Sequence, residues 1–276
     1  MSRPTQTGVL ALLIGNSHAT CMVAALRRKL FPAVTPEIAF RVVGYGSKAF
    51  PGGLVLEAND GTRIVNPVVT AAVDRAFAEA RGRKVWLVSV IGGNAANRMA
   101  IFSSGPAADF LLPGERRADA PAGVQWVPYD AIEATMARQL DSLSEFFARL
   151  PREKLAGVAH LEGPPPCMSN DFVYAALPEA ARRIAVESGE VELTADSIAA
   201  PALRHRLWQC QASVTRQIAE ARGVLYIEPP PQAVDAAGHR RLDTCSDACH
   251  GTPEYGRWAL EHVARRLADS TLGSPI

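Results

Sequence analysis

The fold class is set by the stretch VWLVSVI at residues 85–91, which is almost uninterrupted apolar sequence and ends at Gly92. Short apolar runs of this kind are typical of strands buried on both faces, as in a parallel sheet covered by helices. A second such run, VLYI at residues 224–227, begins after Gly223. Three more runs have strand character, so we expect strands at residues 9–14, 38–43, 84–91, 155–161 and 223–227.

Segments with helical periodicity separate these strands. The clearest begins at Asp130, where Glu133 indicates an acidic capping box, and its apolar residues recur at steps of three and four as far as Leu150. Further helices are predicted at residues 18–30, 67–81, 201–221 and 253–267. Strands alternating with helices predict an α/β fold: a three-layer α/β/α sandwich with a five-stranded, mainly parallel sheet and right-handed crossovers.

The composition is that of an ordinary globular protein. Of the 276 residues, 48% are hydrophobic and 21% are charged, and the formal net charge is +1. A charge so close to zero predicts neither a nucleic acid nor an anionic membrane as a partner. No apolar run approaches the roughly 20 residues that span a bilayer, and the first run is too short for a signal peptide, so we expect a cytoplasmic protein. The five cysteines are odd in number and scattered, which favours reduced thiols over a disulfide framework.

The sequence predicts one domain over residues 1–276, because it contains no internal repeat and no linker. Two irregular insertions are expected, at about residues 102–128 and 163–200. The first is rich in Gly, Pro and Ala and is longer than an ordinary connection. We interpret it as a lid or flap over the site.

Two polar motifs at opposite ends of the chain form a candidate nucleophilic triad. Ser17 follows the first strand in the run IGNSH and lies at the start of a predicted helix, whose N-terminal amides can stabilise an anion. Asp247 and His250 are three residues apart, a spacing that lets a carboxylate orient an imidazole, which can then take a proton from a serine. Each motif also has a purely structural interpretation, Ser17 as an N-cap and the Asp-x-x-His segment as a polar turn before the last helix.

Two glycine-containing turns after predicted strands are candidates for an oxyanion hole. Gly44 and Gly46 follow the second strand, and glycine lets a backbone amide approach a substrate closely. Asn94 follows the third strand, and its side-chain amide is a suitable second donor. Both segments are equally compatible with ordinary turns. A dinucleotide-binding fingerprint is not predicted, because the third glycine and the helix that it requires are missing.

Metal binding is the alternative chemistry at the C-terminal motif. The alternative ligands are His239, Cys245, Cys249 and His250. Their spacing matches no established zinc pattern, so we predict no metal and no cofactor. Four other residues are expected in structural positions, in the core for Cys21 and Cys210 and on edges or solvated faces for His160 and His205.

Taken together, these motifs resemble the SGNH (GDSL-type) hydrolase family. The resemblance runs in order from residue 9 to residue 268 and is carried by four blocks. The first block contains Ser17 preceded by Asn16 in place of the usual Asp, and the third contains Asn94 followed by Ala95, where the family often has Asp. The blocks are residues 14–18, 42–47, 92–94 and 247–251.

The resemblance implies a flavodoxin-like fold in which Ser17 is the nucleophile, His250 the general base and Asp247 its orienting partner. The oxyanion hole would consist of the Gly46 amide, with Gly44 as the alternative, the Asn94 side chain and the Ser17 amide. The implied activity is hydrolysis of a small acyl or acetyl ester, including esters of carbohydrates, through an acyl-enzyme. Two alternatives stay open: an acyltransferase with the same triad, and a non-catalytic binding protein on the same fold. The expected partner is a small-molecule ester, and nothing in the sequence indicates an oligomeric state.

Overall fold

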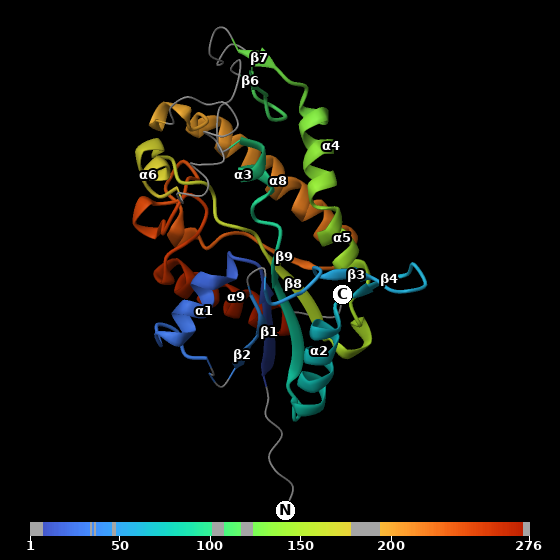
Figure 1. Ribbon diagram of the computed structural model, residues 1–276. Coiled ribbons are helices and arrows are strands. Elements are labelled where there is room, and N and C mark those ends of the chain that lie inside the picture. Colours follow the sequence, from blue (N-terminus) through green and yellow to red (C-terminus); the bar gives the residue numbers. More distant parts are fainter. Residues whose placement is uncertain are drawn as a thin grey trace, which may run out of the picture.

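The computed structural model describes residues 8–33, 35, 37–45, 48–100, 108–116, 124–177 and 194–272. These residues form three layers, a central sheet with helices on each of its two faces (Figure 1). The strands of the sheet are β1 (Val9–Gly15), β2 (Ile38–Gly44), β5 (Lys84–Val90), β8 (Gly157–Leu161) and β9 (Leu225–Ile227). Their order is β2-β1-β5-β8-β9, and every neighbouring pair is parallel. The predicted α/β class and the five-stranded parallel sheet are therefore confirmed.

Helices cover both faces of this sheet. They are α1 (Ala19–Arg27), α2 (Pro67–Glu79), α3 (Ala95–Ala100), α4 (Tyr129–Gln139), α5 (Asp141–Ala148), α6 (Asn170–Ala175), α8 (Pro201–Ala221) and α9 (Pro253–Leu272). Every residue of β1 is buried, and its alternating side chains divide the core in two. Leu12 packs into the core completed by α2, α5 and α8, whereas Leu13 packs under α1 and α9. Within the described part of the chain, no helix is both long and apolar enough to cross a membrane.

The region of residues 128–150 differs from the prediction. It forms two helices, α4 and α5, with a break at Leu140 (φ −98°, ψ 4°), although Leu140 itself is buried. The predicted capping box is wrong, because the helix begins at Tyr129 after an extended Pro128 and no side chain caps it. Asp130 lies in the first turn instead, where its carboxylate still complements the helix dipole.

Two pairs of very short strands were not predicted. The strands β3 (Val55–Glu57) and β4 (Arg63–Val65) form an antiparallel hairpin, and β6 (Ala108–Asp109) pairs with β7 (Gln125–Trp126) in parallel. Strands of two or three residues are too short for an alternating pattern to show in the sequence.

The two predicted insertions fall only partly within the described structure, because residues 101–107, 117–123 and 178–193 lie outside it. The described part of the first insertion is anchored to the body of the protein. Phe110 is almost completely buried, and the neighbouring Asp109 carboxylate forms an ion pair with Arg206 of α8. The lid function of this segment stays a prediction.

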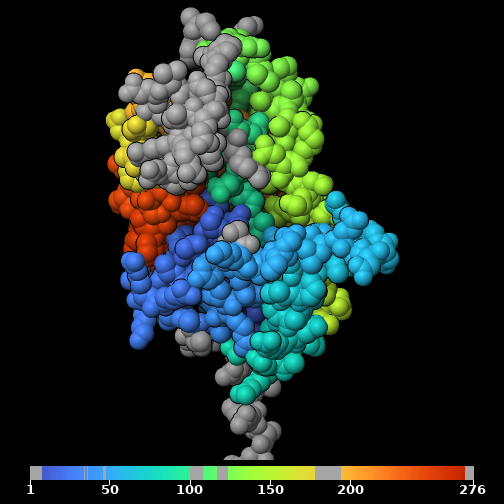
Figure 2. All heavy atoms as spheres, viewed as in Figure 1, coloured from blue at the N-terminus to red at the C-terminus, as the bar shows by residue number. Residues whose placement is uncertain are grey.

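Helices α1 and α9 pack against one another, and this contact brings residues near the start of the described chain beside residues near its end. In Figure 2 the blue N-terminal segment and the orange-red C-terminal segment lie in contact, as they do in Figure 1. Gly256 permits the close approach, because a Cβ at this position would overlap the backbone of Cys21 and Met22. Since α1 begins just after Ser17 and α9 just after His250, the helix pair holds the two candidate motifs at one end of the sheet.

Candidate active site

The candidate residues follow the carboxyl ends of different strands. Ser17 comes after β1, Asn94 after β5, and the segment that carries Asp247 and His250 comes after β9. Because all five strands are parallel, these ends lie along one edge of the sheet, which is where ligands bind in open α/β sheets.

Asp247 and His250 form the predicted pair. The His250 Nδ1 atom lies 2.7 Å from Asp247 Oδ2 and 3.0 Å from Oδ1. The Oδ1 atom also accepts hydrogen bonds from the backbone amides of Cys249 (2.8 Å) and His250 (2.7 Å). Burial alone would raise the pKa of the Asp247 carboxyl, but the hydrogen bonds from the His250 ring and from the two amides hold it well below its usual range. An ionised Asp247 keeps the proton of a neutral His250 on Nδ1, so that Nε2 carries the free lone pair.

Hydrogen bonds from Arg240 hold the turn that carries this pair. Its guanidinium is buried and donates to the carbonyl groups of Cys249 (3.1 Å), Asp247 (3.2 Å) and Ala248 (3.3 Å). Three carbonyl groups that meet on one cation fix the backbone of the turn. We call residues 240–251 the acid–histidine loop.

Ser17 lies in the turn between β1 and α1, which we call the serine turn (residues 15–18). The side chain of Ser17 is half-buried, and its carbonyl group accepts a hydrogen bond from Thr20 N (3.0 Å). Nothing in the described part of the chain forms a hydrogen bond with His250 Nε2, a buried atom, so Ser17 Oγ is not bonded to it here. The role of Ser17 as a nucleophile stays a prediction.

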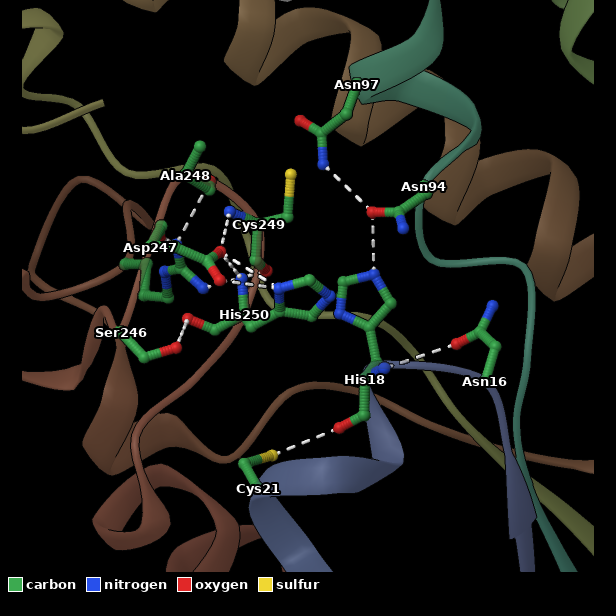
Figure 3. A network of polar contacts seen from close by, with 11 residues as sticks. Asn16, His18, Cys21, Asn94, Asn97, Ser246, Asp247, Ala248, Cys249 and His250 are labelled. Atoms are coloured by element: carbon green, nitrogen blue, oxygen red, sulfur yellow. Dashed lines mark hydrogen bonds and ion pairs between the residues drawn. The ribbon is translucent and has the colours of Figure 1, made fainter. Parts of the chain in front are cut away.

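His18, for which the sequence predicts no role of its own, connects the serine turn to the other candidate residues. Its ring is buried, its centroid lies 5.2 Å from that of His250, and Nε2 lies 2.9 Å from Asn94 Oδ1. Figure 3 shows the His18 ring between the His250 ring and Asn94. Burial and the nearby His250 lower the pKa of His18 to about 4, so the ring is neutral at neutral pH. The available signal was its position directly after the candidate nucleophile.

Gly93 makes room for the His18 ring. A Cβ at position 93 would come within 2.7 Å of His18 Cδ2 and 2.9 Å of Nε2, closer than side-chain contacts allow. The second glycine of the predicted Gly-Gly-Asn block is therefore required by packing against His18. Of the other glycine block, Gly44 is the last residue of β2, whereas Gly46 lies outside the described residues, so its oxyanion role stays a prediction.

A chain of buried polar groups holds the segment after Asn94. The backbone amide of Ala96, in α3, donates to Gln211 Oε1 (2.9 Å), and Gln211 Nε2 donates to Glu162 Oε1 (2.8 Å). Gln211 and Glu162 are almost completely buried, and burial raises the pKa of the Glu162 carboxyl. This chain links α3 to α8 and to the end of β8, and so fixes where Asn94 lies.

The positions of the other histidines and of the cysteines can also be compared with their predicted positions. His160 is wrong as an edge residue, because β8 lies between two strands under helices on both sides; the ring is buried, and burial lowers its pKa to about 3. Cys21 and Cys210 are core residues, as predicted, and all five cysteines are free. His239 packs against His205, with ring centroids 4.3 Å apart. In the described residues, no group of three or more His, Cys, Asp or Glu side chains is placed to hold a metal ion.

Fold and site together define a class of protein: a three-layer α/β/α domain with an aspartate–histidine pair at the carboxyl edge of a parallel sheet. No family model and no curated protein matches the sequence. Similar solved structures are a GDSL-like lipase from Bacteroides thetaiotaomicron VPI-5482, a carbohydrate acetylesterase family member from Sinorhizobium meliloti and an aryl esterase from M. smegmatis.

These structures are distant from the chain. The lipase is 10% identical over 95% of this chain and 88% of its own, with a TM-score of 0.40. The acetylesterase is 11% identical over 96% and 99%, with a TM-score of 0.41, and the aryl esterase is 10% identical over 95% and 99%, with a TM-score of 0.43. The assignment of site residues rests on the contacts described above.

Proposed function

We propose that this protein is a serine esterase that uses Ser17, His250 and Asp247. The observation that carries the proposal is the Asp247–His250 pair: His250 Nε2 forms no hydrogen bond with any described residue and faces the His18 ring of the serine turn (Figure 3). A solvated polar turn does not require an imidazole that packs against a second histidine and has a buried Nε2 atom. A general base that awaits a substrate does require a free lone pair.

The reaction would run in two steps. Ser17 Oγ attacks the ester carbonyl carbon while His250 Nε2 accepts its proton, and the tetrahedral oxyanion is stabilised by the Asn94 amide nitrogen together with the Ser17 and Gly46 amides. The C–O bond of the ester then breaks, and the leaving alcohol takes the proton from His250. In the second step water attacks the acyl-serine through the same base and releases the acid.

One feature of the serine turn supports this course. The Ser17 amide donates no hydrogen bond to any residue that the structure describes, so it is available to an oxyanion. Catalytic hydrogen bonds are often absent without substrate and form only in the Michaelis complex, which reconciles the unbonded His250 Nε2 with a role as the base of Ser17.

The proposed substrate is a small acyl or acetyl ester, including esters of carbohydrates. The same machinery would pass the acyl group to an alcohol if one displaced the water. Adding a sugar or simple alcohol to the assay distinguishes the two, because an acyltransferase forms the new ester faster than it forms the free acid.

The decisive experiment is labelling with a fluorophosphonate, which forms a covalent bond only with an activated serine. Wild-type protein should be labelled at Ser17, Ser17→Ala and His250→Ala should not, and Ser213→Ala on α8 serves as the matched control and should be labelled like the wild type. If folded wild-type protein takes up no label, the esterase proposal is wrong and the fold serves binding.

A further inference from the structure

We propose that His18 is a positioning residue of the active site: it holds the Asn94 side chain by its oxygen and thereby turns the Asn94 amide nitrogen toward the oxyanion. The inference rests on the proposed function, since it assigns a task to a residue beside the triad. It comes from the contacts of three side chains: His18, Asn94 and Asn97.

The orientation of the Asn94 amide follows from its two hydrogen bonds. Asn94 Oδ1 lies 2.9 Å from His18 Nε2 and accepts from Asn97 Nδ2 at 3.3 Å. A carboxamide oxygen has two acceptor sites, and both are used here. The amide nitrogen, with two N–H donors, is therefore the end of the side chain that forms no hydrogen bond with any described residue.

The bond to Asn94 also fixes the tautomer of His18. Because a carboxamide oxygen can only accept, His18 Nε2 must carry the hydrogen. The ring is held in place by burial and by the contact with Gly93, so it presents this N–H in one direction. Of the two donors to Asn94, His18 is the nearer one, and it comes from the residue next to the proposed nucleophile.

His18 does not duplicate the base. The carboxylate partner in the site belongs to His250, whereas His18 Nε2 bonds a neutral amide. Burial also keeps the His18 ring uncharged at neutral pH. An uncharged donor suits the task of orienting a neighbouring amide, because a positive charge on His18 would oppose the protonation of the adjacent His250 that the proposed reaction requires.

The test compares two replacements of His18. In His18→Gln the side-chain Nε2 can still donate to Asn94 Oδ1, whereas His18→Leu has similar bulk and no donor. With an ester such as p-nitrophenyl acetate, we expect His18→Leu to lower kcat by about 10²–10³-fold with little change in KM, as for loss of one oxyanion donor. His18→Gln should stay within about tenfold of the wild type.

A double-variant cycle separates positioning from packing. If His18 acts through Asn94, His18→Leu in the Asn94→Ala background should cost less than about twofold more. Three results would each overturn the inference. In the first, the losses of kcat in the two single variants multiply in the double variant. In the others, His18→Leu has the wild-type kcat, or His18→Gln is as slow as His18→Leu. Thermal unfolding of each variant identifies any that fail to fold.

One readout does not depend on activity. Nitrogen NMR of the wild-type protein should show the His18 ring as the neutral Nε2–H tautomer at pH 7, and an Nδ1–H tautomer would contradict the inference. Failure of the proposed function looks different: wild-type protein would not be labelled at Ser17 at all, whatever the tautomer of His18.

Discussion

The acid–histidine loop and the serine turn are held by different kinds of contact. The Asp247 carboxylate is bonded to Cys249 and His250, two and three residues further on, and Arg240 is bonded to carbonyl groups seven to nine residues away, so the contacts that hold the loop are local in sequence. His18 in the serine turn is bonded to Asn94, 76 residues away. The proposed base is thus held in place by local contacts, whereas the serine turn and Asn94 come together only because β1 and β5 lie side by side.

The largest expected effect tests whether the serine turn and the acid–histidine loop act together in one catalytic triad. Ser17→Ala and His250→Ala should each lower ester turnover by as much as about 10⁶-fold, because either change removes the nucleophilic step. The double variant should be no worse than either single one, since members of a triad act together. The measurement is kcat/KM with an activated ester.

The chain offers a matched control for the histidine. His239 also has a nearby aspartate, with its Nδ1 3.8 Å from Asp235 Oδ2, but it packs against His205 outside the serine turn. His239→Ala should keep nearly full activity. If Ser17→Ala keeps its activity, the serine turn and the acid–histidine loop do not act in one reaction, and the proposed triad is wrong.

The next effect concerns the acid–histidine loop alone. Asp247→Asn retains an oxygen for the amides of Cys249 and His250, so the turn should persist. Its amide would favour the wrong tautomer of His250, with the hydrogen on Nε2, and kcat should fall by about 10⁴-fold.

The control for this change is Asp243→Asn in the same loop. The Asp243 carboxylate is exposed and pairs with Arg241, so its loss should leave kcat nearly unchanged. Equal losses in the two variants would mean that the loop requires negative charge in general and no orienting carboxylate.

The third effect concerns Asn94, whose contact with His18 joins residues that are far apart in the sequence. Asn94→Ala removes the proposed oxyanion donor and should lower kcat by about 10²–10³-fold while KM changes little. Asn97→Ala, which removes only the longer 3.3 Å bond to Asn94 Oδ1, should have a much smaller effect. A rise in KM without a fall in kcat would show that Asn94 binds the ground state and not the transition state.

The same contrast explains what could be predicted from the sequence. The five strands, the helix at residues 201–221 and the Asp247–His250 pair all follow from patterns within a few residues, and all three are present. His18 and Arg240 carry no such pattern, because each becomes important only through burial against residues brought to it by folding. For the same reason His160 was misplaced: its burial depends on the strand order, which residue patterns alone do not supply.

The smallest effect separates the two regions by pH. The folded protein holds His18 neutral, with a pKa of about 4 against 6.5 for the free side chain, so the unfolded chain binds more protons between these values. Stability should therefore fall as the pH drops from 6.5 to 4, and at about 1.4 kcal/mol per pKa unit the His18 contribution amounts to about 3 kcal/mol. Denaturant unfolding of the wild type and His18→Gln isolates it, because His160 titrates in both proteins and cancels in the difference. The pKa of Asp247 is also lowered, but its window lies at lower pH: the fold favours the ionised carboxylate, so this stabilisation is fully present above about pH 4 and is lost only below it. The difference between wild type and Asp247→Asn should stay flat from pH 7 to 4, while that between wild type and His18→Gln changes across the same window. Two flat differences would mean that His18 is accessible to protons in the folded state, and the buried contact with Asn94 could not then be the one that orients the site.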